Sequence, residues 1–134
     1  MSYREDVPAL CVISAGRTVQ AIDLATGAPL WTNPDFGEAA AGALVVTEGR
    51  VYLAGWRQAG AIDARTGRTV WRAEITARGR PGLLRDGDRL LVAGSGVVEC
   101  LGIDGRLLWR TNIPQANSVT IAVGDRVASD DREG

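Results

Sequence analysis

The stretch AIDLATGAPLW at residues 21–31 recurs forty residues later as AIDARTGRTVW at residues 61–71. A shorter third copy, GIDGRLLW, occupies residues 102–109. Each copy carries an Asp, then a Gly, then a closing Trp, in that order. The copies therefore divide the chain into repeats of about 40 residues, and a period of this size is a property of repeat architectures.

Short β-rich runs separated by Gly- and Asp-containing turns fill each repeat. The middle repeat has such runs at 42–46, 51–54, 58–63 and 68–74, and the next repeat has them at 82–85, 89–93, 97–103 and 106–111. Runs of this length and spacing predict antiparallel meanders, and no stretch long enough for a helix has a 3.6-residue period. We therefore predict an all-β fold, a β-propeller built of four-stranded antiparallel blades.

The two ends of the chain are offset by one strand. When the strands of a blade are lettered A to D, residues 9–13, 19–23 and 28–32 align with B, C and D. Residues 118–122 and 126–128 align with A and a weak B. The predicted order is BCD-ABCD-ABCD-AB, which is about three blades. We place the blades at 9–34, 42–75 and 81–112 and a partial blade at 117–128, between polar tails at 1–8 and 129–134.

The recurring residues each have a predicted structural role. An Asp that closes the third strand accepts hydrogen bonds from turn amides. The Gly supplies a positive φ, and the Trp lies on the outermost strand, where it would pack between blades. The pair Asp104–Gly105 also predicts a two-residue type I′ hairpin turn. The structural repeat residues are Asp23, Gly27, Trp31, Asp63, Gly67, Trp71, Asp104, Gly105 and Trp109.

The pattern Ala-x-Asp-x-x-Thr-Gly-x-x-x-Trp, complete at 21–31 and 61–71, resembles the tryptophan-docking motif of quinoprotein-like β-propellers with PQQ-like repeats. This family includes quinoprotein dehydrogenases and the outer-membrane barrel assembly lipoprotein. The resemblance covers residues 9–128 and implies the propeller fold, whereas enzymes and scaffolds share the motif. The dehydrogenases hold a quinone and calcium in a complete propeller and carry a vicinal disulfide, but Cys11 and Cys100 lie far apart here.

Composition and charge exclude several functions. The net charge is -1, so no polybasic surface for nucleic acid or anionic lipid is expected. All 15 basic residues are Arg, which excludes a catalytic Lys and a His base or ligand. The sequence has no CxxC pair, P-loop or nucleophile elbow. We therefore predict no catalytic, cofactor-binding or metal-binding residues, and a protein that is not an enzyme.

The polar N-terminus resembles no secretory signal, and no apolar run reaches ~18 residues. We therefore expect a cytoplasmic protein with no membrane partner and with reduced thiols at both cysteines.

Three features lie outside the periodic set. Trp56 and Arg57 follow the second strand of the middle repeat, and we interpret them either as a half-buried loop or as an interaction surface. The densest basic segment, 78–81, is interpreted as a solvated connection in preference to an anion site. The acidic segment 86–88 is interpreted as a turn in preference to calcium ligands.

Three blades are fewer than the 4–8 of typical propellers and would leave open blade faces and strand edges. We expect the ring to be completed by self-association, with a dimer of about six blades favoured, or by another propeller-repeat protein. A segment of a longer protein is the third possibility. The leading hypothesis is a non-catalytic scaffold or protein-interaction module. The alternatives are a quinone- or metal-binding propeller, and a fragment of a larger propeller sensor or enzyme.

Overall fold

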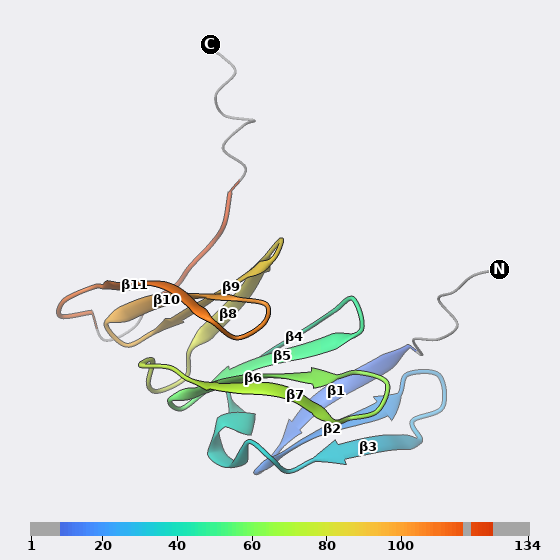
Figure 1. The fold of residues 1–134 in the computed structure, drawn as a ribbon. Coiled ribbons are helices and arrows are strands. Elements are labelled where there is room, and N and C mark those ends of the chain that lie inside the picture. The colour runs from blue at the N-terminus through green and yellow to red at the C-terminus, as the bar shows by residue number, and fades with distance from the viewer. Residues whose placement is uncertain (1–8, 117–118, 125–134) are drawn as a thin grey trace.

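Three antiparallel sheets make up the fold, which a computed structural model describes for residues 9–116 and 119–124. Each sheet is one blade, and its strands pair in chain order (Figure 1). Blade 1 contains β1 (Leu10–Ala15), β2 (Thr18–Asp23) and β3 (Pro29–Asn33). Blade 2 contains β4 (Ala43–Thr47), β5 (Arg50–Gly55), β6 (Gln58–Asp63) and β7 (Thr69–Glu74). Blade 3 contains β8 (Gly82–Asp86), β9 (Arg89–Gly94), β10 (Val97–Gly102) and β11 (Leu107–Asn112). The predicted all-β fold, a partial β-propeller, is confirmed.

The blades stack face to face, with blade 2 in the middle (Figure 1). One hydrophobic core lies between blades 1 and 2 and contains Val19, Phe36, Ala39, Ala40, Val51, Leu53, Ile62 and Ala64. A second core lies between blades 2 and 3 and includes Tyr52, Ala54, Ala59, Ala61, Leu83, Leu90, Val92, Val97 and Leu101. Burial of both faces of the middle sheet explains why β5 reads as a nearly continuous apolar run.

A register shift occurs at the same place in every blade, next to the closing tryptophan. The third and fourth strands pair regularly up to Ala21–Trp31, Ala61–Trp71 and Cys100–Trp109. The pairing then shifts by one residue in each blade. A bulge of this kind bends the strand and changes the direction of a neighbouring side chain. All three tryptophan side chains therefore have the same orientation relative to their own sheet.

The connection between blades 1 and 2 contains a short 3₁₀ helix, η2 (Gly37–Ala41). The alanine-rich segment is too short for a stable α-helix, and it forms this single turn because Ala39 and Ala40 are buried. Phe36, just before it, is 3% exposed and lies against Gly60, where a Cβ would come within 2.1 Å of the Phe36 ring. The connection is thus part of the core.

The turn in blade 3 differs from the prediction. β10 ends at Gly102, which occupies the place that Asp63 takes in blade 2, and Asp104 lies beyond the strand. The Gly102 amide bonds the Arg106 carbonyl at 2.8 Å. Only Gly105 of the three intervening residues has a positive φ, at 93°. The type I′ prediction is wrong, because that turn needs positive φ at both central residues, and the loop is a three-residue turn with a glycine bulge.

The predicted partial blade is not formed in its described part. Residues 119–124 have no strand assignment, whereas 117–118 and the predicted strand at 126–128 lie outside the described residues. A strand is held by the backbone groups of a neighbouring strand, and no described strand pairs with 119–124. Blade 1 has its predicted B, C and D strands, so no A strand covers the free edge of β1 within the described residues.

Candidate interaction surfaces

The tryptophan of each blade docks on a turn of the following blade. Trp31 in blade 1 donates its Nε1–H to the Ala64 carbonyl at 2.8 Å, and Trp71 in blade 2 donates to the Ile103 carbonyl at 2.7 Å. The Trp31 ring covers Gly67, where a Cβ would lie 2.6 Å from the Trp31 Cγ. The Trp71 ring covers Gly105 in the same way, at 2.7 Å. We call each such contact a seam.

The turn that receives the tryptophan is built by its own side chains. Asp63 Oδ1 accepts a hydrogen bond from the Arg65 amide at 2.9 Å, and Thr66 Oγ1 accepts one from the Arg68 amide at 3.2 Å. The Gly67 amide bonds the Asp63 carbonyl at 2.8 Å. The turn of blade 1 has the same three bonds forty residues earlier, although no described residue covers Gly27 there. The turn therefore has its receiving shape whether or not a tryptophan docks on it.

Asn33 adds a polar contact to the first seam that the sequence did not indicate. It is 3% exposed, and its Nδ2 donates to the Gly67 carbonyl at 2.8 Å and to Thr69 Oγ1 at 3.0 Å. The equivalent positions in the other two blades are Ala73 and Thr111. A search for repeated residues could not find Asn33, because it occurs in one repeat only.

Blade 3 presents an unused docking strand at one end of the stack. In β7 every second residue is partly buried, and one of these, Trp71, packs against blade 3. In β11 all six residues are exposed, and Trp109 is 43% exposed. Leu107 and Leu108 lie beside it and are similarly exposed. This end of the stack therefore carries a tryptophan in docking position with no described blade opposite it.

Blade 1 presents an unused receiving face at the other end. The residues by which blade 2 receives blade 1 are at most 2% exposed: Val51, Leu53, Ile62 and Ala64. The strand registers place the blade 1 equivalents at Cys11, Ile13, Ile22 and Leu24. All four are partly or fully exposed, and Leu24 reaches 65%. Among the residues that the structure describes, a Cβ at Gly27 would meet nothing within 4 Å.

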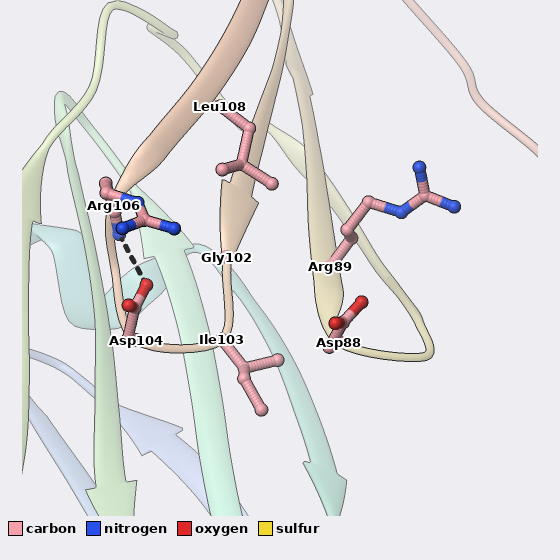
Figure 2. A pocket seen from close by; sticks show the side chains of 7 residues that line it. All are labelled: Asp88, Arg89, Gly102, Ile103, Asp104, Arg106 and Leu108. Atoms are coloured by element: carbon pink, nitrogen blue, oxygen red, sulfur yellow. Dashed lines mark hydrogen bonds between the residues drawn. The ribbon is translucent and has the colours of Figure 1, made fainter.

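A pocket of about 450 Å³ lies beside the last seam turn, at the bottom of blade 3 (Figure 2). Asp104 accepts a hydrogen bond there from the Arg106 amide, and Asp88 and Arg89 lie across the opening from Leu108. The segment 86–88 is the β8–β9 turn. Among the described residues no group of three or more His, Cys, Asp or Glu is placed to hold a metal ion.

The residues outside the repeats lie on two loops that meet. Trp56 is 49% exposed on the β5–β6 loop, and Arg57 beside it has a φ of 61°. The Arg57 amide bonds the Ala77 carbonyl at 3.0 Å, and the Ile75 amide bonds the Arg57 carbonyl at 3.1 Å. These bonds bring Arg57 to the β7–β8 connection that carries Arg78, two segments that sequence analysis treated separately.

The two cysteines differ in environment. Cys100 is fully buried, and burial raises the pKa of its thiol, an effect opposed by Arg89 and reinforced by Asp86 and Asp88. Cys11 is half-buried on the receiving face of blade 1, and both thiols are free. Among the helices of the described residues, none has the length and apolarity needed to cross a bilayer.

Solved structures place this stack among β-propellers. Quinohemoprotein alcohol dehydrogenase ADHIIG from Pseudomonas putida HK5 superimposes with a TM-score of 0.66 at 19% identity, over 79% of this chain and 19% of its own. The computationally designed Ika4 protein gives 0.71 at 18% identity, over 87% and 74%. The designed Ika8 protein gives 0.69 at 17% identity, over 87% and 37%. This chain thus spans about a fifth of the dehydrogenase, and at these identities the likeness shows the fold alone.

No curated protein matches the chain significantly. Residues 55–133, more than half of the sequence, match the family described as outer membrane protein assembly factor BamB. The docking tryptophans, their glycine turns and the stacked four-stranded sheets agree with that match. The chain therefore belongs to this family of PQQ-like repeat β-propellers.

Proposed function

We propose that this chain is a non-catalytic β-propeller interaction module, and that a second copy of the chain covers its two open blade faces. One observation carries the proposal: each end of the described stack has one half of a seam, and no described residue supplies the other half. Trp109 is exposed at one end, and the Leu24–Gly27 turn is exposed at the other.

The contact that would form follows from the two seams inside the chain. The turn of blade 1 has the same length and the same internal bonds as the turn that receives Trp31. By this equivalence, Trp109 of one copy would donate its Nε1–H to the Leu24 carbonyl of the other and cover Gly27. Cys11, Ile13 and Ile22 are the receiving side chains.

The two faces differ, so the association is head-to-tail. A dimer whose two-fold axis passes through the Trp109 face would set tryptophan against tryptophan and leave both receiving turns exposed. Two copies arranged around one axis use both seams and give about six blades, within the range of known propellers. Covering both faces also removes apolar surface that a monomer would expose to water.

Size-exclusion chromatography with light scattering tests this assembly. We expect the 14.2 kDa chain to run as a dimer that dissociates on dilution. Removing a buried aromatic anchor from an interface costs about 2–4 kcal/mol, or roughly 30- to 1,000-fold in Kd. Trp109→Ala should therefore be monomeric at concentrations where wild type is dimeric. Trp56→Ala is the matched control, since Trp56 has a similar exposure of 49% but lies outside both faces.

A mixing experiment tests the polarity. Leu24→Arg should also abolish the dimer, because it places a charge on the receiving face. A mixture of Trp109→Ala and Leu24→Arg still contains one intact docking tryptophan and one intact receiving turn, and should recover a heterodimer. Failure of the mixture to associate, with each variant folded, would refute the head-to-tail arrangement. A folded wild-type monomer at all accessible concentrations would refute completion by a second copy and point to blades of another chain or of a longer one.

The cytoplasmic location expected from the sequence stays a prediction, since the matching family is described as an outer-membrane assembly factor.

A further inference from the structure

A polar pocket of about 240 Å³ is lined by residues of blades 2 and 3. It lies at the ends of the strands that are farthest from the seam turns. It lies where the β5–β6 loop and the β7–β8 connection of blade 2 meet the fourth strand of blade 3. We call it the arginine pocket. Its lining residues are Arg57, Glu74, Ile75, Thr76, Arg78 and Arg110.

Arg110 is held in place by a buried carboxylate. Glu99 is fully buried, and its Oε2 lies 3.0 Å from both Nε and Nη2 of Arg110. The other oxygen, Oε1, accepts the Thr76 amide at 2.9 Å and the Ala77 amide at 3.1 Å. This carboxylate fixes both the guanidinium and the backbone on which Arg78 follows. The Arg110 side chain keeps 40% of its surface exposed beside the pocket.

Arg57 and Arg78 reach the pocket without partners of their own. Two backbone hydrogen bonds between the loops hold Arg57 in a left-handed conformation beside the β7–β8 connection. Within the described residues, neither guanidinium forms a hydrogen bond or an ion pair. The charges of Arg110 and Glu99 cancel. Arg57 and Arg78 carry two positive charges and Glu74 carries one negative charge, so the pocket has one net positive charge. The pocket therefore has a positive field, with one guanidinium held by Glu99 and two others with unused donors.

We propose that the arginine pocket binds a small oxyanion, a phosphate or carboxylate group. Arginine is suited to both, since its planar fork donates two parallel hydrogen bonds to a pair of oxygens. The volume is below the ~300–1,000 Å³ of sites for drug-sized molecules, so a single anionic group fits better than a large ligand. A bound anion would join the β5–β6 loop to blade 3. All six residues lie within one chain, so the site does not depend on the proposed dimer.

Binding is measurable as a shift of the thermal unfolding midpoint at constant ionic strength, with inorganic phosphate in one arm and citrate in the other. We expect a saturable shift with at least one anion, relative to chloride. Arg78→Gln should weaken binding about tenfold or more, as expected for the loss of a charge-assisted contact. Arg80→Gln is the matched control, because Arg80 is an exposed arginine two residues away that does not line the pocket. Glu74→Gln should tighten binding, because it removes the opposing charge.

A shift with phosphate alone assigns the site to phosphate groups, and a shift with citrate alone assigns it to carboxylates. Equal weakening by Arg78→Gln and Arg80→Gln would show a general charge effect and overturn the proposal, as would the lack of a saturable shift with both anions. Should Arg78→Gln not fold, Arg57→Gln serves the same comparison.

Discussion

Replacing a seam glycine by alanine separates the docking contact from the backbone strain of the turn. Gly67 and Gly27 have nearly the same φ, 80° and 78°, in turns with the same internal bonds. They differ in what covers them, because Trp31 lies on Gly67, whereas no described atom lies within 4 Å of a Cβ at Gly27. Gly67→Ala and Gly27→Ala therefore form a matched pair.

The expected magnitudes follow from this geometry. An alanine in the left-handed region costs about 1–2 kcal/mol at either position. At Gly67 the new Cβ would lie 2.6, 2.7 and 2.8 Å from three atoms of Trp31, far inside the 3.5–4.0 Å optimum for two carbon atoms. Displacing the ring costs about 1–3 kcal/mol, and the lost Nε1–H bond to Ala64 adds about 0.5–1.5 kcal/mol. We expect Gly67→Ala to be about 1.5–4.5 kcal/mol less stable than Gly27→Ala.

Urea unfolding followed by circular dichroism, at a concentration where the chain is monomeric, measures the difference. Tryptophan fluorescence provides a second observable, since Trp31 should become more exposed in Gly67→Ala alone. Equal destabilisation by both substitutions would refute the docking account of the seam. Repeating the pair at high concentration connects it with the proposed dimer, because Gly27→Ala should then also weaken association.

Two further predictions concern buried groups. Glu99→Gln should lower the free energy of unfolding by about 2–4 kcal/mol, because the neutral amide leaves Arg110 and two backbone amides without their carboxylate; Glu74→Gln, an exposed control, should stay within about 0.5 kcal/mol of wild type in the same urea titration. Cys100 should be alkylated by iodoacetamide much more slowly than Cys11, as read by mass spectrometry, because only the thiolate reacts and burial raises the pKa of the Cys100 thiol. The stability conferred by that neutral thiol is present below its usual pKa of about 8.5 and is lost as the pH rises through the raised value, which urea midpoints on either side of that range would show.

The repeat in the sequence was sufficient to predict the hairpins because the repeated Asp and Gly residues act locally. Asp63 builds its own turn and Gly67 provides its own φ, so their spacing alone predicts the hairpin. The third copy misled the alignment of strands. Sequence similarity pairs Asp104 with Asp63, which would make this turn three residues shorter than that of blade 2. The strand register pairs Gly102 with Asp63, and the turn is shorter by one residue only.

The contacts that cross between segments were not predictable in this way. Arg57, Arg78 and Arg110 belong to different segments, and only the loop bonds and the buried Glu99 bring them to one pocket. Glu99 itself sits within an apolar run and carries no sequence signal of its role. The predicted strand at 118–122 depended on alignment with an A strand alone, and alignment cannot supply the neighbouring strand that would hold it.

The direction of the seam has a consequence for how such chains change in evolution. Every blade offers a tryptophan forward and a glycine turn backward, so any blade can follow any other. Unequal recombination between two repeats would insert or delete one blade and still leave a tryptophan facing a glycine at each junction. Trp71 docks on the shortened turn at Gly105 as Trp31 does on the longer turn at Gly67, which shows that the junction tolerates variation in its loops. The number of blades can therefore change while the same kind of interface forms at every junction.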